Sequence, residues 1–160
     1  MELKFKVMIR VGRPVGEVFE AVADPKQLSS YFTTGGASGR LEAGTTVMWD
    51  FHDFPGAFPV EVDEVVPHQK IVLRWDAAEG DQTCEGALDV KPAGYKTTVT
   101  MSFTPTDDGR TLVEIEEKGW RETEGGLQAS YGNCMGWSQM LAALKMWVEY
   151  GINLREGAYK

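Results

Sequence analysis

The first 32 residues carry a strand-like pattern followed by a helical one. Apolar side chains first occupy every second position, at Leu3, Phe5, Val7, Ile9 and Val11. Because the side chains of a strand point alternately to its two faces, this period predicts a strand with one face on a core. After Pro14, apolar residues recur at steps of three and four until Asp24 and Pro25, which predicts a short amphipathic helix and its stop. Residues 26–32 predict a second helical turn.

The period of two returns five times in the middle of the chain. The apolar positions of these runs are Val47, Trp49 and Phe51; Phe58, Val60 and Val62; Ile71, Leu73 and Trp75; Val99, Met101 and Phe103; and Val113 and Ile115. Stretches rich in Pro, Gly and Asp separate most of the runs, which favours consecutive hairpins and therefore an antiparallel sheet. Residues 77–95 fit least well, since Ala87, Leu88 and Val90 suit either a short strand or a packed loop.

The last part of the chain predicts one long amphipathic helix beyond the polar, Gly-rich stretch 122–126. Its apolar positions are Trp137, Met140, Leu141, Leu144, Trp147 and Val148. Gln139, Lys145, Glu149 and Glu156 fall on the other side, so the helix has an apolar stripe and a solvated back. A helix of about 25 residues is roughly 37 Å long, which is enough to cross a sheet.

Together these elements predict an α+β fold. A curved antiparallel sheet wraps around a long C-terminal helix, and two short helices follow the first strand. A chain of 160 residues suits one domain, so we expect residues 1–160 to form a single unit. The content of 42% hydrophobic and 25% charged residues is ordinary for a globular protein and does not indicate a fibrous or disordered class.

Charge and segment length restrict the expected partners. The formal charge is -8 and the basic residues form no cluster, which disfavours nucleic acid and anionic lipid surfaces. No stretch approaches the roughly 20 apolar residues that span a bilayer, and the N-terminus lacks the pattern of a signal peptide. We therefore expect a cytoplasmic protein without membrane insertion. Cys84 and Cys134 have no metal-ligand spacing and are expected to be reduced thiols.

Four stretches resemble the START-like (SRPBCC, helix-grip) superfamily, and within it the proteins similar to the activator of heat-shock-protein ATPase. They are residues 14–25 with the Asp-Pro stop, residues 27–32, residues 60–67 with 71–75, and Gly136-Trp137 with Leu141 and Leu144. The resemblance covers nearly the whole chain. It implies the helix-grip fold, with an apolar cavity between the sheet and the last helix, and a connection with the stress response.

The sequence departs from that family at two places. Arg13 stands where the family places a capping Ser or Thr, which weakens the start of the first helix. Residues 77–95 are longer than the family's hairpin. The co-chaperone itself carries a further N-terminal domain that these 160 residues do not include, so the resemblance favours chaperone activation less than ligand binding.

No catalytic residue, metal site or cofactor site is predicted from the polar residues. His52 lies in a strand pattern, but Trp49 and Phe51 define the core face and leave His52 on the solvent face. His68 falls in a turn beside Pro67. Neither histidine accompanies a nucleophile motif, and the glycine pairs lack the context of a phosphate loop.

The candidate ligand-binding residues are the aromatic, Met and Leu side chains of the expected inner faces. They are Trp49, Phe51, Phe58, Trp75, Met101, Phe103, Trp120, Tyr131, Met135, Trp137, Met140 and Leu144. A curved sheet and a straight helix do not touch along their full length, so some of these side chains are expected to line a cavity; ordinary core packing is the alternative. The polar candidates for orienting a ligand are Arg74, Tyr131, Asn133, Ser138 and Gln139.

Three functional hypotheses follow, in order of preference. The first is noncatalytic binding of a small hydrophobic molecule, a lipid or an aromatic polyketide-like compound, as the superfamily resemblance implies. The second is an enzyme of the aromatase or cyclase kind, in which Tyr131 or Arg74 polarises a carbonyl group. The third is a module that binds a protein partner, a chaperone ATPase, for which the sequence offers no support of its own and which predicts a contiguous exposed apolar patch.

Overall fold

One antiparallel sheet forms the frame of the molecule. The computed structural model describes residues 1–80 and 91–160. The strands are β1 (Leu3–Val11), β2 (Gly36–Ala37), β3 (Thr46–Phe51), β4 (Phe54–Val66), β5 (Lys70–Glu79), β6 (Lys91–Pro105) and β7 (Thr111–Trp120). They hydrogen-bond in the order β1-β7-β6-β5-β4-β3-β2, and every pair is antiparallel. The strands from β2 to β7 therefore follow one another as hairpins, as predicted, and β1 pairs with β7.

Three helices accompany the sheet in the described part of the chain. They are α1 (Val15–Ala23), α2 (Pro25–Leu28) and α3 (Glu124–Tyr150). The N-cap of α1 is Pro14, one residue beyond the capping position expected at Arg13, and the helix start has no side-chain cap. The Asp24 side chain, in contrast, accepts a hydrogen bond from the Lys26 backbone N–H and so caps α2.

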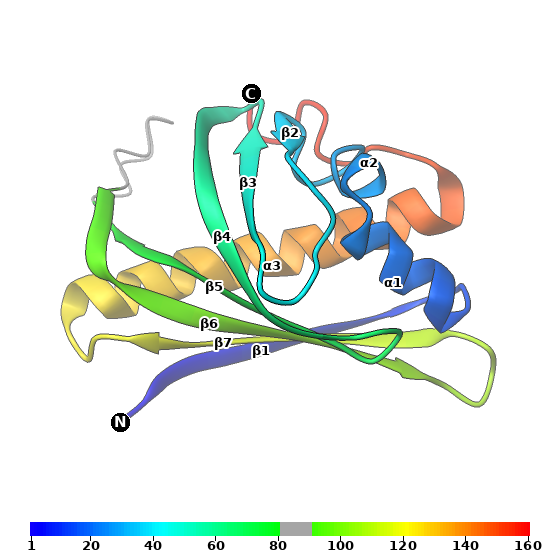
Figure 1. Cartoon of the computed structure of the whole chain (residues 1–160), viewed down its shortest axis with the longest axis horizontal. Coiled ribbons are helices and arrows are strands. Elements are labelled where there is room, and N and C mark those ends of the chain that lie inside the picture. Colours follow the sequence, from blue (N-terminus) through cyan, green and yellow to red (C-terminus); the bar gives the residue numbers. More distant parts are fainter. Residues whose placement is uncertain (81–90) are drawn as a thin grey trace.

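The helix α3 has 27 residues and lies in the concave side of the sheet (Figure 1). It begins inside the Gly-rich stretch, because the Thr123 side chain accepts a hydrogen bond from the Gly126 N–H at 3.1 Å. It ends at Gly151, whose left-handed backbone (φ 68°) is easiest for a residue without a Cβ. Glu156 is therefore not part of the helix, contrary to the prediction, and the chain turns back after Gly151.

The main core lies between the inner face of the sheet and α3. Leu141, Leu144 and Met101 are almost fully buried, as are the apolar residues of β6 and β7 at alternate positions. The inner side chains of β1 are half-buried and pack against the same core. The apolar stripe of α3 thus packs on the inner face of the sheet, in contact with β1, β5 and β7, as expected for a sheet that wraps around the last helix.

Strands β5 and β6 reach into the stretch 77–95, which the sequence pattern fits least well. Glu79 pairs with Lys91, so both strands extend beyond the range expected from their apolar runs. Ala87, Leu88, Val90 and Cys84 lie outside the described residues.

Cys134 is a free thiol. None of the helices in the described ranges is long and apolar enough to cross a membrane.

Candidate functional site

Six aromatic side chains meet between β3, β4, β5 and the middle of α3, and we call them the aromatic cluster. They are Phe32, Trp49, Phe51, Phe58, Trp75 and Trp137. The ring centroids of Trp75 and Trp137 are 5.3 Å apart, and Trp49 meets Trp75 edge-on at 6.0 Å. These are the tilted and edge-to-face geometries that aromatic rings prefer. The cluster therefore joins the sheet to the helix through ring contacts.

A carboxyl group lies at the inner edge of this cluster. Glu117 belongs to β7 and is completely buried. Its Oε1 accepts a hydrogen bond from Trp75 Nε1 at 3.1 Å, and the Asn133 Nδ2 of α3 reaches both carboxylate oxygens, at 2.8 and 2.9 Å. Among the described residues no cation pairs with Glu117. A buried acid thus accepts hydrogen bonds from neutral donors alone.

Burial decides the protonation of this acid. It raises the pKa of Glu117 from its ordinary 4.5 to about 7, although the Asn133 and Trp75 donors act in the opposite direction. Trp137 also lowers the pKa of Glu117, so its indole lies close to the carboxyl. Its Nε1 nevertheless has no hydrogen-bond partner among the described residues. Near neutral pH the group is therefore divided between an acid that donates a proton and a carboxylate that accepts one.

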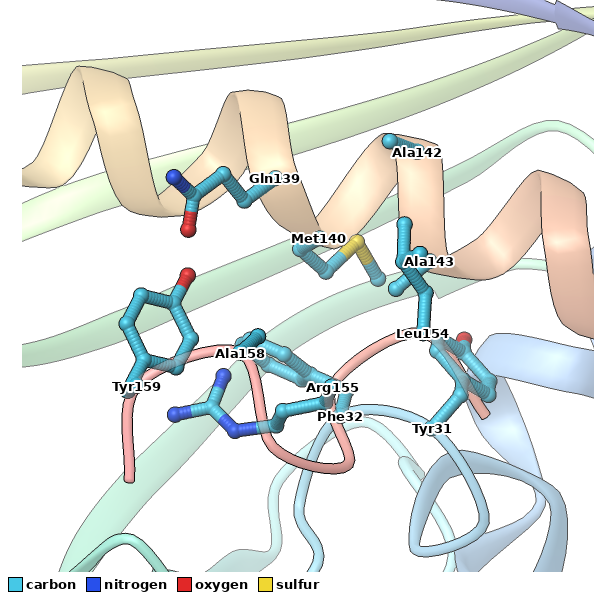
Figure 2. A pocket seen from close by; sticks show the side chains of 10 residues that line it. All are labelled: Tyr31, Phe32, Gln139, Met140, Ala142, Ala143, Leu154, Arg155, Ala158 and Tyr159. Atoms are coloured by element: carbon cyan, nitrogen blue, oxygen red, sulfur yellow. The ribbon is translucent and has the colours of Figure 1, made fainter. Parts of the chain in front are cut away.

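A pocket of about 260 Å³ borders the cluster on the side of the chain end, and we call it the C-terminal pocket. Its lining residues are Tyr31, Phe32, Gln139, Met140, Ala142, Ala143, Leu154, Arg155, Ala158 and Tyr159. Figure 2 shows α3 on one side of this space and residues 154–159 on the other. Phe32 lines the pocket and also packs on Trp49 and Trp137, so this member of the aromatic cluster lies between the pocket and the two tryptophans.

Most of the expected ligand-binding residues are buried, but they do not form one group. Trp49, Phe51, Phe58, Trp75 and Trp137 lie in the aromatic cluster, and Met140 lines the C-terminal pocket. Met101, Phe103 and Leu144 belong to the main core. Trp120 lies in a separate small core, where its ring stacks on Phe5 at 5.5 Å.

The structure does not bring Tyr131 and Met135 to the inner face. Their exposed fractions are 60% and 54%, so the inward placement predicted for them is wrong. The reason is the helical period, because these two residues are four apart and lie on the side of α3 opposite Trp137. Of the polar candidates, Asn133 reaches the interior and the exposed Gln139 lines the C-terminal pocket, whereas Arg74 and Ser138 are exposed away from both sites. His52 and His68 are exposed as expected.

Sequence reasoning missed Glu117, Asp53 and Arg155. For Glu117 a signal was present, because the alternation that buries Val113 and Ile115 on β7 places residue 117 on the same face. For Asp53 and Arg155, which pair across 102 positions, no local pattern exists. Within residues 1–80 and 91–160, no cluster of His, Cys, Asp and Glu is arranged to hold a metal ion.

Comparison with solved structures supports the fold. A protein from Staphylococcus saprophyticus superposes with a TM-score of 0.75 at 23% identity, over 96% of each chain. DynU16, described as a putative protein in the dynemicin biosynthetic locus, gives 0.74 at 24% identity; the match covers 94% of this chain and 48% of that one. The Aha1 dimer from Colwellia psychrerythraea gives 0.69 at 17% identity, over 93% of this chain and 98% of that one. At these identities the likeness establishes the fold alone.

Sequence comparison establishes the family. Among curated proteins none matches the chain. The family model of the activator of Hsp90 ATPase homolog 1-like proteins matches residues 13–149, from the start of α1 almost to the end of α3. This range includes all four stretches in which the resemblance was recognised. The chain therefore belongs to the activator of Hsp90 ATPase homolog 1-like family, within the START-like superfamily.

Proposed function

We propose that the protein binds a small hydrophobic molecule without transforming it, in the C-terminal pocket and against the aromatic cluster behind it. The observation that carries the proposal is the position of the pocket. A preformed space of about 260 Å³, lined mainly by apolar and aromatic side chains, borders the cluster at the ring of Phe32, which packs on Trp137. Apolar concave sites with a few polar groups are the usual form of small-molecule sites.

Size and lining indicate the kind of molecule. The pocket lies just below the 300 to 1,000 Å³ range typical of drug-sized ligands, so a molecule of two or three rings or a short acyl chain fits it best. Met140 lies on its inner wall, and an unbranched thioether side chain adapts to varied shapes. Rotation of Phe32 would extend the site towards Trp49 and Trp137.

Polar groups behind Phe32 would orient such a molecule. The indole Nε1 atoms of Trp49 and Trp137 are buried and have no hydrogen-bond partner among the described residues. An oxygen atom of a ligand would pair with donors that otherwise stay unsatisfied at a cost in free energy. The Glu117 carboxyl, near neutral pH, offers either a donor or an acceptor beside Trp137.

The fluorescent probe N-phenyl-1-naphthylamine, which is uncharged and apolar, tests this proposal. We expect saturable binding to the wild-type protein, with quenching of tryptophan emission. Leu154→Trp places a large ring at the wall of the pocket and should weaken binding at least about tenfold, which corresponds to 1.4 kcal/mol. Met135→Trp adds the same ring on the exposed side of α3 and serves as the control. Equal binding by both variants would remove the pocket from the proposal.

An enzyme of the aromatase or cyclase kind is the second candidate, and Glu117 is the observation that favours it. A carboxyl group with a pKa of about 7 is poised for proton transfer, whereas Arg74 and Tyr131, the expected catalytic side chains, are exposed. Glu117→Gln distinguishes the two candidates. For a binding protein the variant keeps the probe affinity within a few fold and no turnover of polyketone substrates occurs in either form. For an enzyme, wild-type turnover is lost while binding persists.

A further inference from the structure

The chain turns back after α3 and covers the C-terminal pocket. Residues 152–160, which we call the C-terminal segment, contribute Leu154, Arg155, Ala158 and Tyr159 to the outer wall. In Figure 2 these side chains face Met140 and Gln139 of α3 across the pocket. A ligand that reaches the aromatic cluster from this side must therefore pass beneath or displace the segment.

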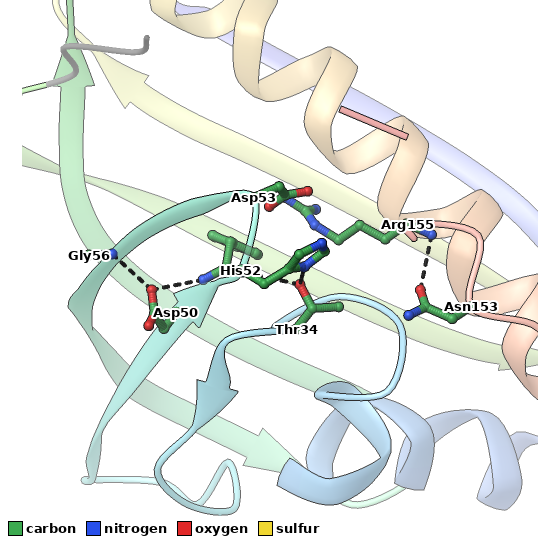
Figure 3. A network of polar contacts seen from close by, with 8 residues as sticks. Thr34, Asp50, His52, Asp53, Gly56, Asn153 and Arg155 are labelled. Atoms are coloured by element: carbon green, nitrogen blue, oxygen red, sulfur yellow. Dashed lines mark hydrogen bonds and ion pairs between the residues drawn. The ribbon is translucent and has the colours of Figure 1, made fainter. Parts of the chain in front are cut away.

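One ion pair attaches the C-terminal segment to the turn between β3 and β4 (Figure 3). Arg155 Nη2 lies 2.9 Å from Asp53 Oδ1, and the two side chains are only 12% and 1% exposed. Asp53 belongs to the two-residue connection of the β3–β4 hairpin. The Asn153 side chain accepts a hydrogen bond from the Arg155 N–H at 3.0 Å, which fixes the backbone at the point of attachment.

Aromatic contacts complete the attachment. The Arg155 guanidinium lies over the ring of Phe51 at 4.4 Å and over that of Tyr159 at 4.9 Å. The Tyr159 ring contacts Phe54 at 5.7 Å, and the Lys160 ammonium lies 5.5 Å above the same ring. Every one of these contacts joins side chains of the segment to the tip of the β3–β4 hairpin or to each other.

The backbone of the C-terminal segment is not part of the sheet. In the ranges 1–80 and 91–160, no backbone hydrogen bond joins residues 153–160 to a strand. The segment can therefore lift without breaking backbone hydrogen bonds of the sheet. Elements held only by side-chain contacts open at a low cost in free energy. The ion pair itself is incompletely satisfied, since Asp53 Oδ2 and Arg155 Nε are buried without partners among the described residues. Desolvation offsets much of the attraction in such pairs.

From this geometry we propose that the C-terminal segment is a lid over the ligand pocket, latched by the Asp53–Arg155 ion pair, and that the ligand enters when the lid lifts. The inference rests on the proposed function for the identity of the pocket. The lid proposal makes a prediction about the rate of ligand association. When only the open form admits a ligand, the association rate is proportional to the open fraction. Removing either partner of the latch leaves a buried unpaired charge or polar group and so favours the open form.

Stopped-flow binding of N-phenyl-1-naphthylamine measures this rate. Asp53→Asn and Arg155→Met should each raise the association rate constant about tenfold, because each raises the open fraction. Arg40→Gln is the matched control, since it breaks an exposed ion pair, Arg40–Glu20, that involves neither the C-terminal segment nor a residue lining the pocket, and it should leave the rate unchanged. The variant Asp53→Leu with Arg155→Met replaces the pair by apolar groups and should return the rate towards that of the wild type.

Trypsin provides a readout that needs no ligand. The enzyme cleaves after Arg155 only when this side chain leaves its buried position, so the cleavage rate reports the open fraction. Asp53→Asn should raise cleavage at Arg155 about tenfold over wild type and Arg40→Gln should not. Unchanged association rates with normal probe binding would overturn the lid and leave the proposed function standing. Absence of probe binding would overturn the proposed function, and unchanged cleavage in Asp53→Asn would then overturn the latch as well.

Discussion

The amide of Asn133 on α3 donates to both oxygens of Glu117 on β7, at 2.8 and 2.9 Å, inside the hydrophobic core. This one side chain connects the long helix to the inner face of the sheet through a single nitrogen, Nδ2, that donates to both carboxylate oxygens. Trp75 donates to the same carboxyl from β5, so three elements meet at one buried acid. The network explains how a carboxyl group persists where the fold otherwise places apolar residues.

Asn133→Ala should destabilise the protein. The substitution leaves the buried carboxyl with fewer donors, and an unsatisfied buried polar group costs about 1 to 3 kcal/mol. Urea unfolding at pH 7 measures the loss. Gln128→Ala, at an exposed position of the same helix, is the control and should change stability by less than about 0.5 kcal/mol. A loss for Asn133→Ala no larger than that of the control would show that the amide does not support Glu117.

Glu117 should make stability fall as pH rises through neutrality. The folded-state pKa of about 7 exceeds the ordinary 4.5, so the folded state binds more protons than the unfolded state between these values. The stabilising contribution is complete below pH 4.5 and is lost as the pH rises to about 7. Comparison with Glu117→Gln cancels all other titrating groups. From pH 5 to pH 8, the wild type should lose about 2 to 3 kcal/mol relative to the variant. Parallel stability profiles would contradict the raised pKa.

Two glycines of α3 should respond in opposite ways to the same substitution. A Cβ at Gly126 would lie 2.0 Å from the Arg121 carbonyl oxygen, whereas a Cβ at Gly136 meets no heavy atom within 4 Å. Gly136→Ala should therefore stabilise the helix by about 0.5 to 1 kcal/mol, through propensity alone. Gly126→Ala should cost about 1 to 3 kcal/mol, because the backbone must shift. Thermal unfolding of the two variants gives the comparison, and stabilisation by both would show that α3 does not start against Arg121.

The fold was largely predictable because its elements are amphipathic. Strict alternation from Val47 to Phe51 and from Ile71 to Trp75 marks strands with one face on a core, and the stripe from Trp137 to Val148 marks a long helix. The helix start was less evident, since Gly-rich sequence disfavours helix and only the Thr123 cap decides its position. The alternation on β7 also places Glu117 on the inner face, but a charged residue at a buried position contradicts the usual pattern.

The candidate site was predictable only in part. Five of the expected aromatic residues do meet, because the face of a strand is readable from its period. The position of the C-terminal segment could not be predicted from the sequence, since the segment has no hydrophobic period and is held by side chains that are distant in sequence. Asp53 and Arg155 show this, because one lies in a turn and the other lies beyond the last helix, 102 positions along the chain.

Methyl NMR of the methionines tests most directly whether the ligand lies between α3 and the C-terminal segment. Met140 lines the pocket, Met135 lies on the exposed side of the same helix, and Met8 is exposed on β1. Titration with N-phenyl-1-naphthylamine should shift the Met140 methyl resonance, through the ring current of the bound probe, while those of Met135 and Met8 stay unchanged. A shift of Met135 or Met8 without one of Met140 would contradict the account.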